Sequence, residues 1–138
     1  MLRRIDLNDD DVAARVVEIQ HAAYRIEADL IGFDGIPPLH ETVADVRRHD
    51  LCWLGSWENE DMAAIIAWTE ANGVCEIDRL AVHPNFMRHG HGRALISPLL
   101  RHQLVVVSTG TANIPARRLY ESLVSYRSSN ATSPPTSL

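Results

Sequence analysis

The sequence predicts an α/β domain in which helices flank a mixed β-sheet. Two observations carry this prediction: a long stretch with helical periodicity precedes three apolar runs separated by turn signals, and a glycine-containing loop then joins a strand to another helix. The chain has 138 residues, 46% hydrophobic and 22% charged, which is the composition of a single globular domain. We expect residues 1–127 to form this domain and the Ser/Thr/Pro-rich residues 128–138 to form a disordered tail.

The first part of the chain reads as a strand followed by two helices. Residues 2–7 alternate weakly and are expected to form the first strand. Asn8 precedes three aspartates, which is a helix-start signal, and apolar residues then recur every three or four positions; this predicts a helix over residues 9–30. Glycines and prolines end that helix, and a shorter helix is expected over residues 40–49.

Three strands are expected in the middle of the chain. Residues 51–57 and 62–69 are apolar runs separated by a short polar segment, which is the pattern of a hairpin. Asn72-Gly73 is a strong two-residue turn signal and leads into a strand over residues 74–82. These strands are therefore predicted to form an antiparallel meander.

The second half returns to helices. A helix is expected from His91 to His102, kinked at Pro98 because proline lacks a backbone N–H. A short apolar strand follows over residues 104–108, and residues 114–123 read as the last helix. The predicted order of elements is thus β-α-α-β-β-β-α-β-α.

Charge is divided unevenly along the chain. The formal net charge of −5 argues against nucleic-acid binding by bulk electrostatics. Residues 1–78 carry 17 acidic and 6 basic side chains, whereas residues 79–120 hold six arginines and no acidic residue. This split indicates an anion-binding half facing an acidic half, or else basic residues that the fold balances with acidic ones. The sequence shows neither a signal peptide nor an apolar span, so a cytoplasmic protein without a membrane partner is expected.

The most informative segment is a glycine loop that opens a helix. Gly90 and Gly92 let the backbone approach a ligand closely, and N–H groups at a helix start bind phosphate. Arg88 and Arg93 add positive charge at the same place. A dinucleotide fingerprint needs a third glycine where Leu95 stands, and a Walker loop needs a lysine, which this chain lacks. The segment is therefore a pyrophosphate loop of another kind, or a plain turn.

Two segments resemble the GNAT superfamily of acyl-CoA-dependent N-acetyltransferases. Leu80-Ala81-Val82-His83-Pro84, together with the loop over residues 88–94, fits the strand, loop and helix pattern of that family. Residues 108–121 are similar to its Asn-x-x-Ala…Tyr segment after the fifth strand. The resemblance covers about residues 2–123 and implies a GNAT-like sheet with an acetyl-CoA site between the fourth and fifth strands.

The resemblance also implies roles for individual residues. Backbone groups of Leu80 and Val82 would bind the pantetheine arm, residues 87–94 would cradle the pyrophosphate, and Tyr120 would protonate the leaving thiolate. Glu76 stands where such enzymes frequently carry a base, with Asp78 on the same strand face or a water as alternatives. The expected cofactor-binding residues are Leu80, Ala81, Val82, Met87, Arg88, His89, Gly90, His91, Gly92, Arg93, Ala94, Asn113, Ala116 and Tyr120.

The acceptor implied by the resemblance is an amine of a small molecule or a peptide. Free amines near pKa 10 are mostly protonated at neutral pH, so carboxylates that attract them are useful near the site. The family's acceptor site borders the region between the first two helices, which corresponds to residues 30–39 here. Candidate carboxylates flank it, and each also reads as an ordinary solvated side chain: Glu27, Asp29, Asp34 and Glu41.

The chain departs from the family pattern at two places. Met87 stands where the loop pattern has Arg or Gln, so weaker phosphate binding is expected. The residues after Tyr120 offer no counterpart to the family's last two strands, so the C-terminal hairpin is expected to be missing. The fifth strand would then be an open edge unless a homodimer covers it. The alternative function is a catalytically impaired acyl-CoA-binding or protein-interaction module.

The sequence predicts neither a metal site nor a disulfide. His89 and His91 form a His-x-His pair, but two imidazoles without a third ligand at good spacing are more often polar loop groups. Cys52 and Cys75 are expected on strands that the third strand separates, which predicts two buried thiols.

Overall fold

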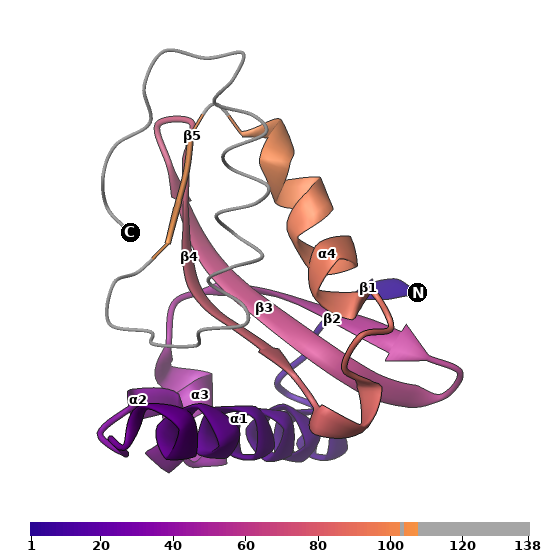
Figure 1. The fold of residues 1–138 in the computed structure, drawn as a ribbon. Helices are drawn as coiled ribbons and strands as arrows, with labels where there is room; N and C mark the ends of the chain where they lie inside the picture. The colour runs from indigo at the N-terminus through magenta and orange to yellow at the C-terminus, as the bar shows by residue number, and fades with distance from the viewer. Residues whose placement is uncertain (103, 108–138) are drawn as a thin grey trace.

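The computed structural model describes residues 1–102 and 104–107, which form one five-stranded sheet with helices on both faces (Figure 1). The strands lie in the order β1-β2-β3-β4-β5, so neighbours in the sequence are neighbours in the sheet. Their bounds are β1 Leu2–Arg4, β2 Cys52–Glu58, β3 Asp61–Ala71, β4 Val74–Val82 and β5 Leu104–Val107.

The sheet is mixed, as the sequence predicts. Strands β1 to β4 pair in antiparallel fashion, whereas β5 runs parallel to β4 after a helical crossover. The β3–β4 turn is the predicted one: Asn72 and Gly73 have φ values of 54° and 80°. Positive φ at both central residues is the geometry of a type I′ turn, which matches the twist of the flanking strands.

Helix α1 (Asp10–Ile31) confirms the predicted long helix, but its cap is one residue later than expected. Asp9, not Asn8, is the N-cap, and its carboxylate accepts hydrogen bonds from the N–H groups of Asp11 and Val12 at 3.0 and 3.2 Å. Asn8 is not the cap because the helix begins only after Asp9. At the other end Gly32 adopts φ 67°, the left-handed conformation that commonly ends helices.

Two short helices, α2 (Pro37–His40) and α3 (Val43–Arg48), replace the single helix expected over residues 40–49. Glu41 between them is extended, with φ −75° and ψ 144°. Thr42 then starts α3 through a reciprocal capping box with Asp45, which makes a second helix start more favourable than continuation.

Helix α4 (His91–Ile96) continues as a 3₁₀ turn, η2 (Ser97–Arg101), in place of one helix to His102. The change occurs next to Pro98, which cannot donate a helical hydrogen bond. A second 3₁₀ turn, η1 (Pro84–Phe86), precedes α4. The first strand is also shorter than predicted. The predicted helix over residues 114–123, the tail and the expected loss of a C-terminal hairpin lie outside the described residues.

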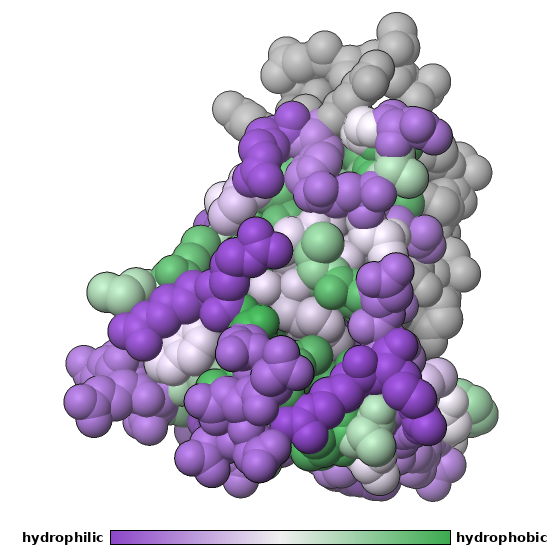
Figure 2. Space-filling model, turned by 180° about the vertical axis from the view of Figure 1, so that it is seen from behind, coloured by the Kyte–Doolittle hydropathy of each residue, from purple (hydrophilic) through white to green (hydrophobic). Residues whose placement is uncertain are grey.

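Two hydrophobic clusters hold the layers together. Figure 1 shows α1, α2 and α3 on one side of the sheet and α4 on the other. Seen from behind that view, hydrophilic residues cover most of the coloured surface and hydrophobic ones show as smaller patches (Figure 2). The cluster under α1–α3 includes Val16, Ile19, Tyr24, Trp53 and Ile65, and the cluster under α4 includes Ile66, Trp68, Ile77, Leu95 and Leu99.

The two cysteines form no disulfide, but only one of them is buried as predicted. Cys52 is half-buried and Cys75 is buried, and both are free thiols. Within residues 1–102 and 104–107, no helix combines the length and the apolar character that crossing a bilayer requires.

Candidate active site

A β-bulge in β4 separates the part of the strand that pairs with β5 from the part that does not. Ala67 on β3 lies opposite Arg79 but the next residue, Trp68, lies opposite Ile77, so Asp78 is the additional residue on β4. The pairing with β5 covers residues 74–77. From Asp78 onward, the edge of β4 that faces away from β3 has no strand partner among the residues that the structure describes.

The backbone groups exposed along this edge follow from the pairing with β3. The N–H of His83 donates to the carbonyl oxygen of Ala63 at 2.8 Å, so these two residues form a hydrogen-bonded pair. Hydrogen-bonded and non-hydrogen-bonded pairs alternate along antiparallel strands, so Ala81 bonds to β3 whereas Leu80 and Val82 do not. Leu80 and Val82 therefore direct their N–H and C=O groups away from β3.

Tyr24 of α1 packs against this edge from the α1 side of the sheet. Its side chain is fully buried, and its hydroxyl donates to the carbonyl oxygen of Leu80 at 3.3 Å. Burial raises the pKa of Tyr24 well above 10, although the positive charge of Arg79 opposes that shift. The phenol therefore remains a protonated donor at every physiological pH.

The loop between η1 and α4 presents several backbone N–H groups in succession. Arg88 and Gly90 have φ values of 67° and 85°, so the chain turns twice in the left-handed region before the helix begins. The first helical hydrogen bond runs from the N–H of Ala94 to the carbonyl of Gly90, 3.0 Å, which leaves the N–H groups of residues 91–93 ahead of the helical ladder. With the exposed side chains of Arg88 and Arg93, this loop can bind an anion.

A buried ion-pair network lies under β4 on the side of α1. Arg79 is 4% exposed, and its guanidinium donates to the carboxylate of Glu41, to Asp78 Oδ2 at 2.7 Å and to Gln20 Oε1 at 3.1 Å. His49 Nε2 lies 2.7 Å from the second carboxylate oxygen of Glu41. The network joins α1, the segment between α2 and α3, and the bulge of β4.

The network keeps both buried partners charged. Burial alone would raise the pKa of Glu41, but hydrogen bonds from Arg79 and His49 outweigh it and hold this pKa below 4.5. Burial likewise opposes the charge of Arg79, and the hydrogen bond to Glu41 with the nearby Asp78 raises its pKa. Arg79 therefore has a structural role. It does not belong to the anion-binding surface that the excess of arginines in residues 79–120 suggested.

The two candidate bases on β4 occupy different surroundings. Glu76 is exposed and lies opposite Val106, within the stretch that pairs with β5. Its neighbours Cys75 and Ile77 pack into the cluster under α4, so Glu76 lies on the face of α1. Asp78 is half-buried at the start of the unpaired edge, and one of its oxygens is bonded to Arg79.

The four carboxylates expected near the acceptor divide into two pairs. Asp29 and Asp34 are exposed, as ordinary solvated side chains are. Glu27 and Glu41 are 1% and 9% exposed, so the solvated interpretation is wrong for these two. Glu41 is explained by its ion pair with Arg79.

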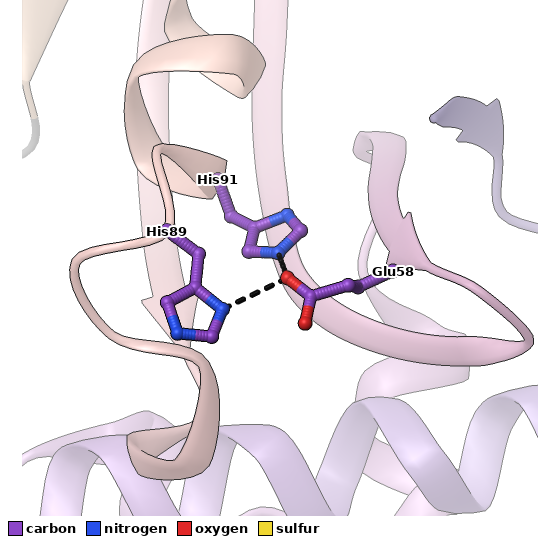
Figure 3. A group of neighbouring side chains, drawn as sticks. All are labelled: Glu58, His89 and His91. Carbon is purple, nitrogen blue, oxygen red and sulfur yellow. Dashed lines mark hydrogen bonds and ion pairs between the residues drawn. The ribbon is translucent and has the colours of Figure 1, made fainter.

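The two loop histidines converge on a carboxylate at the end of β2 (Figure 3). Glu58 Oε1 lies 2.8 Å from His89 Nδ1 and 2.9 Å from His91 Nε2. His91 is 8% exposed, and its other ring nitrogen lies 2.7 Å from Ser56 Oγ. Hydrogen bonds from His91 and His89 lower the pKa of Glu58 below its ordinary value. The sequence offers no third ligand at suitable spacing for the two imidazoles, whereas the fold brings Glu58 next to both.

Most of the sequence matches one known protein family. The model of the Acetyltransferase (GNAT) family matches residues 13–125, which is most of the chain. The chain belongs to this family. The GNAT fold expected from Leu80–Val82 and from the glycine loop is thereby confirmed.

One curated relative in sequence is much longer than this chain. UPF0157 protein YqkA of Bacillus subtilis (strain 168) is 32% identical over 124 residues. The match covers 87% of this chain and 36% of that protein, so the chain spans about a third of the length of this curated relative.

Solved GNAT structures share the fold at low sequence identity. The PaiA N-acetyltransferase of Thermoplasma acidophilum, in complex with coenzyme A, superposes with a TM-score of 0.68 at 13% identity, over 89% of this chain and 87% of that one. The ribosomal-protein-S18-alanine N-acetyltransferase of Escherichia coli gives 0.65 at 19%, over 89% and 75%. Diaminobutyrate acetyltransferase EctA of Paenibacillus lautus, in complex with its substrate L-2,4-diaminobutyric acid and coenzyme A, gives 0.60 at 17%, over 93% and 76%.

The GNAT site residues expected from the sequence fall partly within the described structure. Residues 80–82 form the unpaired edge of β4, and residues 87–94 form the loop that follows it directly in the chain. Met87, which replaces the Arg or Gln of the family pattern, is exposed. Asn113, Ala116 and Tyr120 lie outside the described residues.

Several polar groups beside β4 on the side of α1 could not be identified from the sequence. Gln20, Tyr24 and His49 gave no signal, because each stands in a pattern that an ordinary helix or loop would also show. Arg79 did give one: an arginine directly before the apolar residues Leu80–Val82 requires an ionic partner if the strand is buried. Its partner Glu41 is 38 residues away, so the pair becomes evident only in the fold.

Proposed function

We propose that this GNAT chain binds acetyl-CoA along the unpaired edge of β4 and transfers its acetyl group to an amine. The observation that carries the proposal is the junction of that edge with the glycine loop. Leu80 and Val82 offer backbone hydrogen-bonding groups on a line that leads into the N–H groups of residues 91–93. The amides of the pantetheine arm of acetyl-CoA can pair with the backbone groups of β4, and its pyrophosphate can bind the N–H groups of the loop.

The mechanism is direct attack of a neutral amine on the thioester. The amine nitrogen forms a bond to the acetyl carbon, the carbon–sulfur bond breaks, and the products are an amide and coenzyme A. The amine loses one proton to a base, and the leaving thiolate gains one from an acid. The family resemblance assigns the acid to Tyr120, which balances the two proton transfers.

The base is assigned to Glu76, with Asp78 as the alternative. Glu76 is exposed, so its carboxylate is accessible to solvent and to a substrate amine. Asp78 is nearer the start of the unpaired edge, but its carboxylate is bonded to the buried Arg79, and protonation would weaken that ion pair. Glu76→Gln and Asp78→Asn, tested separately, distinguish between these two candidates for the base.

The acceptor is proposed to carry a protonated amine in addition to the neutral amine that attacks. Asp29 and Asp34, the exposed carboxylates beside residues 30–39, supply negative charge that attracts a protonated amine. A diamine or diamino acid is favoured over a neutral amine for this reason. An N-terminal amine of a peptide is the second class to test, because one structural neighbour is named as a protein N-acetyltransferase.

The proposal is tested by acetyl-CoA-dependent thiol release from the full-length protein with a panel of amines. The panel contains 2,4-diaminobutyrate, spermidine and a peptide with N-terminal alanine. Replacement of Tyr120 by Phe should lower kcat by about 10²-fold or more while acetyl-CoA affinity stays the same. Tyr126→Phe makes the same chemical change six residues later and should leave kcat unchanged.

Either of two results would contradict the proposal. An unchanged kcat in Tyr120→Phe removes the acid assignment. Acetyl-CoA binding without thiol release on any amine supports the impaired binding module instead. Between the two base candidates, the base is the one whose amide variant has a lower kcat and unchanged thermal stability. Unchanged kcat in both variants indicates that a water molecule accepts the proton.

A further inference from the structure

Three potential metal ligands meet where the β2–β3 hairpin touches the glycine loop. Glu58 comes from the last position of β2, His89 from the loop, and His91 from the first position of α4. One oxygen or nitrogen atom of each lies within 4.8 Å of the other two. Figure 3 shows both imidazole rings pointing toward the carboxylate of Glu58.

The hydrogen bonding of His91 is compatible with a ligand role. Its Nδ1 lies 2.7 Å from Ser56 Oγ, and its Nε2 lies 2.9 Å from Glu58 Oε1. When the serine oxygen accepts from Nδ1–H, the neutral ring directs the lone pair of Nε2 at the carboxylate. In the other tautomer Ser56 Oγ–H donates to Nδ1 and Nε2–H donates to Glu58, and a bound cation would take the place of that proton. In metal sites, a hydrogen bond to the other ring nitrogen also orients the ligating histidine.

We propose that Glu58, His89 and His91 bind a divalent transition-metal ion of the Zn²⁺ class. Two imidazole nitrogens and one carboxylate oxygen suit Zn²⁺ better than the hard cations Mg²⁺ and Ca²⁺, which take oxygen ligands. Three protein ligands leave a fourth position for water or for a group of a bound molecule. This inference goes beyond the acetyltransferase function, and because His89 and His91 belong to the loop assigned to the pyrophosphate, its test measures metal binding in the absence of acetyl-CoA.

The two contact distances of Glu58 are close to the spacing of ligands around one ion. Tetrahedral ligands about 2.1 Å from Zn²⁺ lie about 3.4 Å from one another. The nitrogen–oxygen distances are 2.8 and 2.9 Å, so Glu58 has to move outward by about half an ångström. Its side chain is 37% exposed and that of His89 is 45% exposed, so both can shift and the ion can enter from solvent.

Part of the site is formed before the ion arrives. His91 is buried and fixed by Ser56, and Glu58 precedes the tight β2–β3 turn at Asn59, whose φ is 57°. His89, on the exposed part of the loop, completes the set. The bound ion would therefore link the β2–β3 hairpin to the loop that leads into α4.

The test is direct metal titration of the full-length protein after it has been stripped with EDTA. Co²⁺ serves as the spectroscopic probe and Zn²⁺ is measured by competition with a chromophoric chelator. The expected result is one ion per chain, with visible cobalt bands of a nitrogen and oxygen site and no intense near-ultraviolet thiolate band. His89→Gln and Glu58→Gln should each weaken Zn²⁺ binding by at least about tenfold.

A matched control replaces a histidine that faces a single carboxylate elsewhere. His102 Nε2 lies 2.7 Å from Glu70 Oε1, the same kind of contact with one imidazole in place of two. His102→Gln should bind Zn²⁺ as the unmodified protein does. Circular dichroism and thermal unfolding in EDTA verify that each variant is folded. His91 is left intact in the main comparison because it is buried.

The outcomes separate the metal site from its rivals. Absence of stoichiometric binding overturns the proposal and leaves a histidine–glutamate contact that braces the loop. Binding that His89→Gln and Glu58→Gln do not weaken also overturns it and indicates adventitious ligands. A strong thiolate band assigns the ion to Cys52 or Cys75 instead.

Discussion

Removal of both partners of the buried Arg79–Glu41 ion pair should destabilise the fold no more than removal of either partner alone. Arg79→Met leaves the buried carboxylate of Glu41 with His49 as a hydrogen-bond partner. Glu41→Leu leaves the guanidinium with Asp78 and Gln20. The double variant buries two apolar side chains of similar volume and no charge.

The magnitudes follow from the partners that each variant retains. Breaking a buried pair costs roughly 3 to 5 kcal/mol when the remaining charge has no compensation. Each single variant keeps part of the hydrogen bonding of the remaining charge, so about 3 kcal/mol is expected for each. The double variant removes the desolvation of both charges but also the hydrogen bonds from Arg79 to Asp78 and Gln20, so about 3 kcal/mol is expected for it as well. Independent sites would instead cost about 6 kcal/mol, so the coupling energy is about 3 kcal/mol.

Urea denaturation of the four proteins measures this coupling. The exposed Arg25–Asp29 pair on α1, 3.8 Å apart, is the control, and its coupling should be no more than about 0.5 kcal/mol. Additive single effects at the Arg79–Glu41 pair, or a coupling equal to that of the surface pair, would refute the assignment of a buried ion pair at this position.

The same pair predicts the pH dependence of stability. The pKa of Glu41 in the folded protein lies below its ordinary value of 4.5, so the folded state releases the proton more easily than the unfolded state does. The stabilisation from Glu41 is therefore fully present above pH 4.5 and is lost as the pH falls through the lower, folded-state value. The stability difference between the unmodified protein and Glu41→Leu should shrink below pH 4.5. A constant difference across that range would contradict the direction of the shift.

Two further predictions concern the loop and a thiol. Gly90→Ala and Gly32→Ala place a Cβ at left-handed positions, φ 85° and 67°, where nothing lies within 4 Å, so each should cost about 1 to 2 kcal/mol of backbone strain. Only Gly90→Ala should weaken acetyl-CoA binding, and equal affinity in both variants would remove the loop from the cofactor site. Burial and the nearby charge of Glu70 raise the pKa of Cys75 to about 12, so iodoacetamide at pH 8 should leave it unmodified in the folded protein. Rapid native alkylation, detected by mass spectrometry, would contradict its burial.

Local patterns were sufficient to predict the long helix and the meander. The apolar periodicity of α1 and the Asn72-Gly73 turn are encoded within short windows of sequence. The division of residues 37–48 into two helices was missed because the capping box of Thr42 competes with helix continuation, and periodicity does not report that competition. Helix boundaries depend on such caps, so they were predicted less accurately than the elements themselves.

The candidate site was predictable where its residues are contiguous. The β4 edge and the glycine loop lie within 15 residues of one another and carry a family pattern, so the sequence identified them. The bulge at Asp78 was not predicted, because it depends on the register between β3 and β4. The approach of Glu58 to His89 and His91 required a contact over 31 to 33 residues, which the His-x-His pattern alone does not reveal.

Calorimetric titration of acetyl-CoA into the full-length, EDTA-treated protein tests the central claim most directly. We predict one site per chain with micromolar affinity or tighter, since the β4 edge and the loop both contribute hydrogen bonds. The use of stripped protein keeps this result independent of the proposed metal ion. A protein that is folded by circular dichroism yet binds no acetyl-CoA would contradict the assignment of the β4 edge and glycine loop as the cofactor site.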